Sequence, residues 1–374
     1  MKKLTLIIIS VLFLLPPIQK LNAGKWKRLI AEPTFELWAN PLNYNTLFAG
    51  GEGRYVYRSY DAGETWDTLK INWSNYSAIM NNLMVTPHDT NVIILGGLNF
   101  RDLRRSSNQG EDWEIVLSPK HGVELNGKAL AYDPVEPNVI YLGEFTTGIF
   151  YKTTDHGRTW DSISRIMENR RIRVGPDEYK DTVLPADIAS IGMRQDSSNI
   201  LFTNTMTSKV FISTDAGKNW QVTDTLTRPP YGTDCEITRM LFSSRDPLVG
   251  YVTVTYITEG NQPNGGLHKT TDGGYTWEKI AFADTSLWAV AVREVNNQDE
   301  VFVGGYTEHY HVPFDFKIVG NGLVAGSTDG GQTWHHQGHS INWVVEKPNL
   351  MMPFNDLFFV NRKFGYCVRD SGAV

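Results

Sequence analysis

One eight-residue pattern recurs six times along this chain and constrains its fold more than any other feature. It reads Ser or Thr, any residue, Asp, any residue, Gly, any residue, a Thr-like residue and Trp, as in SYDAGETW, which ends at Trp66. Its third position holds Asp61, Asn108, Asp155, Asp215, Asp272 and Asp329, and its last holds Trp66, Trp113, Trp160, Trp220, Trp277 and Trp334. Successive copies are 47 to 60 residues apart, and a period of about 50 residues is typical of propeller blades.

We call each copy a box and interpret it as a folding device. Its carboxylate is expected to accept backbone N–H bonds across a turn, its Gly to adopt a positive φ, and its Trp to fill the space between neighbouring sheets. The second copy, SSNQGEDW, departs from the pattern because Asn108 replaces the Asp and Asp112 replaces the Thr. We therefore predict a structural role for the third-position residue and the Trp of every box.

The segments around each box predict four strands, A to D, because runs of β-branched and aromatic residues bounded by turn residues are typical of strands. The innermost strands are expected at Phe35–Pro41, Ala78–Pro87, Lys128–Pro134, Ile188–Arg194, Ile237–Ser244, Trp288–Arg293 and Asn355–Val360. These seven segments predict an all-β, seven-bladed propeller of four-stranded antiparallel blades, with each box at the turn between strands C and D.

The two ends of the sequence predict an exported protein with an incomplete last blade. Two lysines, an apolar run over residues 4–15 and the small residue Ala23 have the order of a signal peptide, so we expect residues 1–23 to be removed and 24–374 to form one domain. The apolar run is shorter than the roughly 20 residues that cross a bilayer. We expect residues 25–30 to close the ring as a strand D, and the chain to stop within the last blade.

Charge and cysteine content exclude several classes of protein. The net charge of −6 becomes −9 without the three lysines of the leader, and an acidic protein is a poor candidate for binding nucleic acid. Cys235 and Cys367 are too few for a disulfide framework and are interpreted as inert thiols. We expect a secreted, periplasmic or cell-surface monomer that has no cofactor, no metal ion and no membrane span after cleavage.

The loops predict which face of the propeller binds a ligand. The A–B turns are short and alike, whereas the B–C and D–A connections are long and different, and binding residues gather on variable loops of a rigid scaffold. The connection over residues 164–187 carries four arginines, which suit an anionic partner or pair with acids of their own loop. These arginines are Arg165, Arg170, Arg171 and Arg173.

Aromatic and histidine residues of the same face give further binding candidates. Tyr231, Tyr310 and Trp343 suit stacking on sugars or peptide side chains, or else they pack between blades. His309 and His311 have the spacing of half a zinc or copper site, but no residue in the sequence fixes the other ligands. We therefore interpret them as surface histidines and predict no metal centre.

The boxes resemble the Asp-box, or BNR, repeat of sialidases, sortilin-type receptors, xyloglucan-cleaving glucanases and the photosystem II stability and assembly factors. The resemblance covers nearly all of residues 24–374 and implies a propeller whose boxes lie at the blade periphery, away from any active site. The sequence lacks the Arg-Ile-Pro motif that a sialidase carries before its first box. It also lacks the Cys-rich module of sortilin-type receptors, so neither activity is indicated.

Two phrases of the sequence favour different functions. NPLNYNTLFAGG (residues 40–51) resembles blades of xyloglucanases, which place two carboxylates across a cleft between two propellers. The segment over residues 357–374 resembles blades of the assembly factors, which bind a partner protein. Because the chain has the length of one propeller, we expect a non-catalytic module that binds or scaffolds a protein or glycan partner. The alternative is a glycoside hydrolase, with Asp133, Asp234 or Asp315 in its carboxylate pair.

Overall fold

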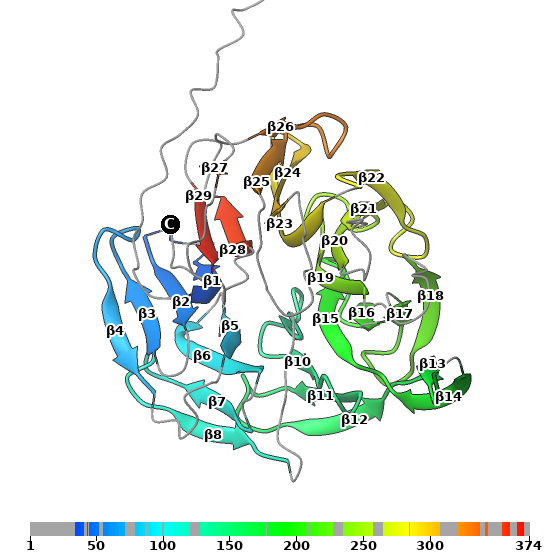
Figure 1. Cartoon of the computed structure of the whole chain (residues 1–374). Coiled ribbons are helices and arrows are strands. Elements are labelled where there is room, and N and C mark those ends of the chain that lie inside the picture. The colour runs from blue at the N-terminus through cyan, green and yellow to red at the C-terminus, as the bar shows by residue number, and fades with distance from the viewer. Residues whose placement is uncertain are drawn as a thin grey trace, which may run out of the picture.

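The computed structural model of the chain describes residues 34–40, 43, 45–51, 55–71, 79–86, 89–98, 101–119, 128–176, 178–205, 207, 209–226, 235–256, 265–283, 285–306, 321–336, 341–342, 354–359 and 365–369. Every helix or strand assigned within these ranges is a β-strand, so no helix there is long and apolar enough to cross a membrane. The sheets stand around a common axis, as in a propeller (Figure 1).

Six sheets each contain four consecutive antiparallel strands, ordered A to D from the axis outward. The first three are β1 (Thr34–Ala39), β2 (Leu47–Gly51), β3 (Tyr55–Ser59) and β4 (Asp67–Lys70); β5 (Ile79–Thr86), β6 (Asp89–Leu98), β7 (Leu103–Ser106) and β8 (Glu114–Leu117); and β9 (Leu130–Tyr132), β10 (Ile140–Gly143), β11 (Ile149–Thr153) and β12 (Asp161–Arg165).

The next three sheets follow the same order along the chain. They are β15 (Ile188–Met193), β16 (Leu201–Thr205), β17 (Lys209–Ser213) and β18 (Gln221–Thr225); β19 (Cys235–Phe242), β20 (Gly250–Tyr256), β21 (Gly266–Thr270) and β22 (Glu278–Ala281); and β23 (Ser286–Val295), β24 (Gln298–Tyr306), β25 (Asn321–Ser327) and β26 (His335–His336), with β27 (Ile341–Asn342) also paired to β25.

Contacts between the innermost strands close the ring. In chain order these strands are β1, β5, β9, β15, β19, β23 and β28 (Phe354–Phe359); each contacts the next, and β28 contacts β1. All seven coincide with the inner strands expected from the sequence. The described residues nevertheless form six four-stranded blades, not the seven predicted, because the seventh place holds a two-stranded sheet of β28 and β29 (Gly365–Arg369). The strand expected over residues 25–30 lies outside the described residues.

The boxes form the turns between strands C and D, as predicted. In the first box, Ser59 Oγ accepts the N–H of Gly63 and Asp61 Oδ1 accepts the N–H of Thr65, both at 2.8 Å. Hydrogen bonds from the hydroxyl and N–H of Thr65 lower the pKa of Asp61 to about 2. The indole N–H of Trp66 donates to the carbonyl of Gly63, and the same bond recurs in all six boxes at 2.9–3.1 Å, so the six Trp occupy equivalent positions.

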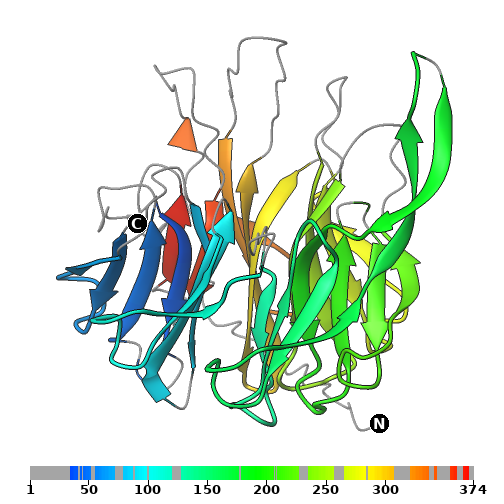
Figure 2. The same ribbon diagram turned by 90° about the horizontal axis from the view of Figure 1, so that it is seen from below.

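Each box also contacts the A–B turn of its own blade. The residue before the box Gly donates its N–H to a carbonyl of that turn at 2.9–3.0 Å in all six blades. This residue has a positive φ of 57–79°, and the Gly that follows it has a positive φ of 79–94°, whereas the sequence predicted a positive φ for the Gly alone. The A–B and C–D turns therefore share one face, and the B–C and D–A connections lie on the opposite face (Figure 2).

The Gly and the Trp of a box pack against the preceding blade. A Cβ on Gly157 would lie 2.4 Å from Ile94 Cδ1 of that blade, and Trp160 packs in the same apolar cluster as Ile94. Gly274 has the same relation to Phe202, again at 2.4 Å, in the cluster that contains Trp277. The apolar core therefore lies between blades, and each of these boxes fits its Gly closely against it.

A polar bond that the sequence did not reveal joins the blades as well. In three blades the residue directly before the box is a cation that donates to the carbonyl of the positive-φ residue in the next box. We call this bond the inter-blade latch. It occurs from Arg58 to Gln109 at 3.0 Å, from Arg105 to His156 at 2.9 Å and from Lys269 to Gly330 at 2.8 Å.

The second box keeps its geometry because its two departures from the pattern compensate. Asn108 Oδ1 accepts the N–H of Asp112, and Asn108 Nδ2 donates to the carboxylate of Asp112, both at 2.9 Å. In the first box the direction is opposite, because the hydroxyl of Thr65 donates to Asp61 Oδ2 at 2.6 Å. In the second box the side-chain donor is therefore at the third position and the acceptor at the seventh, the reverse of the first box.

Replacing Asn108 with Asp should destabilise the protein, although it restores the consensus residue. Two carboxylates would then face each other across the turn, with an expected loss of about 1 kcal/mol in the free energy of unfolding. Adding Asp112→Thr should recover that loss, because the consensus donor returns. Urea unfolding of the two single variants and the double variant measures this coupling, and additive effects would show that the two residues do not act as a pair.

Candidate functional site

A β-bulge at the same level of the innermost strands places charged residues around the axis. The register shifts between Thr34 and Glu36 in β1, before Arg239 in β19 and before Asp356 in β28. Shifts occur at equivalent points of β5, β15 and β23. A bulge adds one residue to a strand and re-aims the side chain that follows. Each of the three named shifts is followed by a charged residue.

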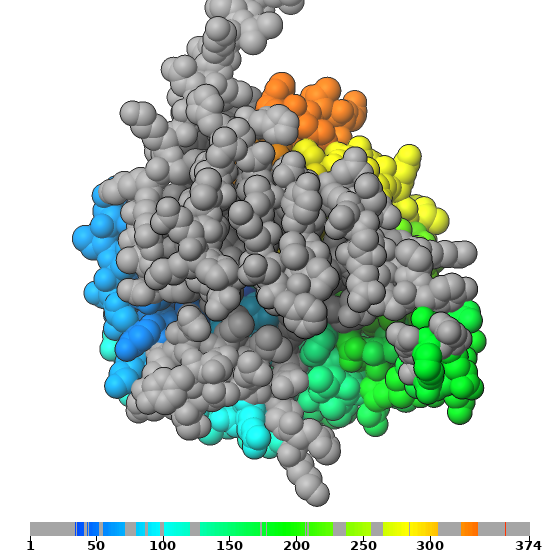
Figure 3. Space-filling view, viewed as in Figure 1, coloured from blue at the N-terminus to red at the C-terminus, as the bar shows by residue number. Residues whose placement is uncertain are grey.

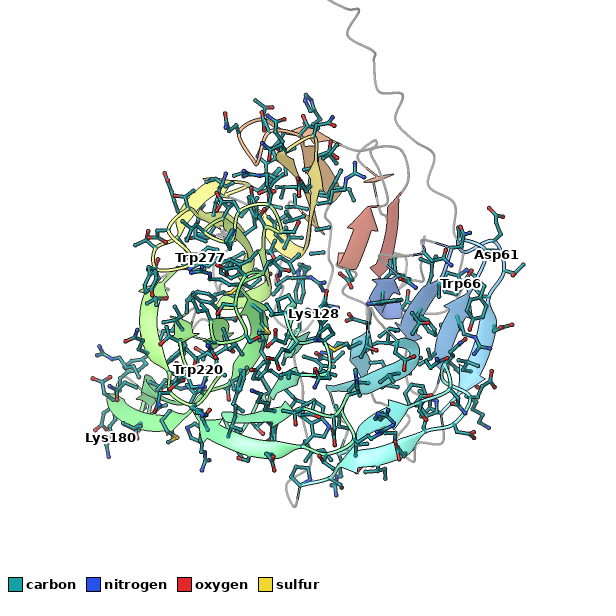
Figure 4. All side chains as sticks on the ribbon, turned by 180° about the vertical axis from the view of Figure 1, so that it is seen from behind. Asp61, Trp66, Lys128, Lys180, Trp220 and Trp277 are labelled. Atoms are coloured by element: carbon teal, nitrogen blue, oxygen red, sulfur yellow. The ribbon has the colours of Figure 1, made fainter. Side chains whose placement is uncertain are left out.

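These residues and Lys128, which precedes β9, form a charged network that we call the collar (Glu36, Lys128, Arg239 and Asp356). The ammonium group of Lys128 contacts the carboxylate of Glu36 directly and lies 3.3 Å from Asp356 Oδ2. Arg239 Nη1 lies 3.3 Å from Asp356 Oδ1. Asp356 also accepts the N–H of Leu37 at 3.3 Å. The collar thus joins side chains from four places in the ring, and Figure 4 shows Lys128 near its middle.

Burial decides the charge of Glu36. Removal from water raises its pKa to about 8, the attraction of Lys128 opposes this rise, and Asp356 adds to it. Arg239 is the remaining charged group that acts on Glu36. At neutral pH the collar therefore holds two cations, one carboxylate and a Glu36 side chain that is mostly protonated.

A cavity of about 190 Å³ adjoins the collar. Glu36, Lys128 and Arg239 line it, together with apolar residues that lie further along the same inner strands and along β5. The apolar residues that matter here are Trp38, Met84, Leu130 and Tyr132. The sequence analysis did not identify this site. When the sequences of the inner strands are aligned, several of them carry a charged residue at the same position before the A–B turn. This repeated charge is the sequence feature that could have revealed the site.

The carboxylates proposed for glycoside hydrolysis are not brought together. Asp133 is fully buried and accepts the N–H groups of Val135 and Glu136 and the hydroxyl of Ser198, so it stabilises a turn. Asp234 and Asp315 lie outside the described residues. The pair that the structure does bring together is Glu36 and Asp356, through their shared contact with Lys128.

The arginine-rich connection is a β-hairpin, not the loop that the sequence predicted. Strands β13 (Met167–Arg173) and β14 (Tyr179–Pro185) pair in continuous register from Met167 opposite Pro185 to Arg173 opposite Tyr179. The alternation of side chains along both strands explains the correction, because two seven-residue strands were read as a polar loop. Figure 2 shows the hairpin rising beyond the ring on the face of the long connections, and Figure 3 shows it at the rim.

A buried acid fixes the base of the hairpin to the fourth blade. Glu168 accepts the Nε–H of Arg170 at 2.9 Å, the hydroxyl of Thr207 at 2.6 Å and the ammonium of Lys209 at 3.3 Å. Arg170 Nη1 donates to Asp187 at 2.6 Å. Because Glu168 and Asp187 accept its hydrogen bonds, Arg170 anchors the hairpin; its expected contact with a ligand stays a prediction.

The other arginines have different surroundings. Arg171 is exposed, and its guanidinium lies 5.6 Å from the ring centre of Tyr179. Arg165 is exposed and donates to the carbonyl of Thr147 at 2.8 Å. Arg173 belongs to β13, but its side chain lies outside the described part. Of the four predicted arginines, Arg171 is thus the one described here on the outer surface of the hairpin.

The remaining predicted site residues fall outside the described residues. These are Tyr231, His309, Tyr310, His311 and Trp343. Within the described ranges, no group of three or more His, Cys, Asp and Glu side chains is placed to hold a metal ion. The aromatic and histidine candidates therefore stay predictions.

Glu36 should make the protein less stable as the pH rises. Its pKa in the folded state is above the usual 4.5, so its stabilising contribution is complete below about pH 4.5 and is lost as the pH rises through about 8. Glu36→Gln, which removes this titration, should be more stable than wild type at pH 9 by on the order of 1–3 kcal/mol. Urea unfolding of both proteins from pH 5 to 9 measures the difference, and parallel pH profiles would contradict the assignment.

Comparison with known proteins supports the fold. No family model and no curated protein sequence matches the chain. Among solved structures, it is similar to a GH74 xyloglucanase from Xanthomonas campestris, with 17% identity, a TM-score of 0.65 and coverage of 94% of this chain and 53% of that one. YCF48 bound to a D1 peptide gives 14% identity, a TM-score of 0.60 and coverage of 94% and 95%. An ancestral GH74 enzyme is 16% identical, with a TM-score of 0.60 and coverage of 93% of this chain and 45% of that one. The chain thus spans about half the length of these two GH74 enzymes, and shares the propeller fold with them and with YCF48.

Proposed function

We propose that this chain is a secreted, non-catalytic propeller that binds a partner through the face of its B–C and D–A connections. The observation that carries this proposal is the hairpin β13–β14. It stands out from that face, its base is anchored by Glu168, and its outer surface has no other role in the ring. We also propose that residues 1–23 are its signal peptide and that β28 and β29 are the inner half of a seventh blade.

The outer surface of the hairpin favours a protein partner over a glycan. Met167, Val174 and Val183 are 45%, 49% and 59% exposed, which is unusual for three apolar side chains on one short hairpin. Arg171 and Tyr179 lie on the same side as Met167 and Val183, because the register places all four on alternate positions. Exposed apolar residues beside Arg and Tyr are typical of protein interfaces.

One observation favours the alternative, a glycoside hydrolase. Glu36 and Asp356 both contact Lys128, and burial raises the pKa of Glu36 to about 8, as in the acid of a carboxylate pair. Both carboxylates are nevertheless buried, at 6% and 1% exposure, and both are paired to the same cation. A polysaccharide would have to reach them through a cavity of about 190 Å³, so the binding function is better supported.

Changing Val183 to Asp should reduce binding of a protein partner about tenfold, because a charge would replace an apolar contact at the centre of the interface. Val222→Asp is the matched control, since Val222 is a valine of similar exposure, 51%, on β18 and not on the hairpin. Quantitative affinity capture compares the proteins retained by wild type and both variants. Partners that bind wild type and the control but not Val183→Asp support the proposal, and equal retention by all three contradicts it.

Release of reducing sugars from xyloglucan and other polysaccharides tests the alternative. We expect no hydrolysis by wild type. If wild type hydrolyses a polysaccharide and the Asp356→Asn variant does not, the protein is a glycoside hydrolase and the proposed binding function is wrong. A glycan array run with the same preparation tests for lectin activity. Binding to the array would show that the partner is a glycan and not a protein.

A further inference from the structure

The central cavity has a charged end and an apolar end. Its volume of about 190 Å³ exceeds the roughly 150 Å³ of an engineered cavity that binds benzene. The collar forms the charged end, and the apolar part is lined by Trp38, Met84, Leu130 and Tyr132. Tyr132 is 37% exposed, so the lining extends to the protein surface. A site of this kind suits a small ligand with one polar end and one apolar end.

The cations of the collar have hydrogen-bonding capacity left for a ligand. Arg239 pairs with Asp356 through Nη1, and a guanidinium has five N–H donors, so donors remain beside this one pair. The Arg239 side chain is 24% exposed and lines the cavity. Lys128 reaches the same cavity. Both donors are therefore placed at the wall of one cavity.

The charge of the collar favours an anion. Asp356 balances one of the two cations, and burial keeps Glu36 mostly protonated at neutral pH. Lys128, Arg239 and Asp356 are the charged groups that act on Glu36, and β2 presents Gly50 opposite it. One positive charge therefore remains at the charged end of the cavity.

We propose that the central cavity binds a small organic carboxylate. Lys128 and Arg239 hold its charged end, and its apolar body lies against Trp38 and Met84. An inorganic anion would satisfy the donors but leave the apolar wall uncovered, whereas a neutral apolar molecule would leave the donors without an acceptor. This site lies on the axis of the ring and is independent of the partner surface proposed for the hairpin.

Benzoate and benzamide test the chemistry of the ligand, because they have the same shape and differ in charge. Ligand-observed NMR at pH 6.5 should show benzoate binding at least about tenfold more tightly than benzamide and more tightly than inorganic phosphate. Equal affinity for benzoate and benzamide, or no binding of benzoate, would overturn the proposal. Binding of phosphate as tight as that of benzoate would also overturn it, since the apolar wall would then contribute nothing.

Removal of one cation tests the place of binding. Lys128→Met should weaken benzoate binding about tenfold or more. Lys218→Met is the control, because Lys218 is an exposed residue of the fourth box turn, and its loss should leave binding unchanged. An unchanged affinity in Lys128→Met, or the same weakening in both variants, places the ligand elsewhere and overturns the proposal.

The pH dependence gives a second test that does not depend on Lys128→Met being folded. Between pH 6.5 and pH 9 the wild type should lose about tenfold in affinity for benzoate, because Glu36 ionises and cancels the remaining positive charge. Glu36→Gln should show no such loss. A wild-type affinity that does not change with pH, or an equal loss in Glu36→Gln, would overturn the proposal.

Discussion

The contact between each box and the preceding blade is the interaction on which this ring depends. A box brings a Gly without a side chain and a Trp with the largest side chain to one boundary, and in three boxes a carbonyl there accepts the inter-blade latch. At Gly274 there is no space for a Cβ, because it would lie 2.4 Å from Phe202. The box is therefore a joint between blades as much as a turn within one, and the spacing of blades follows from it.

Fixed blade spacing also determines what the axis of the ring contains. Because the inner strands start at one face and carry their bulges at the same level, the residues after the bulges meet around the axis. Glu36 and Asp356 are far apart in the sequence, yet both contact Lys128. Such a network is costly to bury unless its charges are paired, and its position beside a cavity is the basis of the proposed ligand site. The hairpin, by contrast, lies at the rim of the ring, and the packing between blades does not determine which residues its outer surface carries.

The sequence predicted the features that depend on local pattern. The boxes and all seven inner strands were identified because their signals lie within a few residues, as in SYDAGETW. The collar was not identified, because the bulge that aims Arg239 depends on the pairing between β19 and β20, and the sequence does not show which charged residues of other strands lie next to it. The hairpin was mistaken for a loop since its arginines suggested a solvated segment. The sequence also did not reveal that Glu168 and Asp187 are the acceptors of Arg170.

Hydrogen exchange on a Gly274→Ala variant tests most directly whether the boxes join the blades into one cooperative ring. The added methyl group should force the fourth and fifth blades apart, and Gly175→Ala at the hairpin tip is the matched control outside the ring. If the ring opens as a unit, amide exchange in Gly274→Ala should become faster in the strands of all blades, and in the control it should not. Faster exchange limited to β15–β22 would contradict this, because each pair of blades would then be stable on its own.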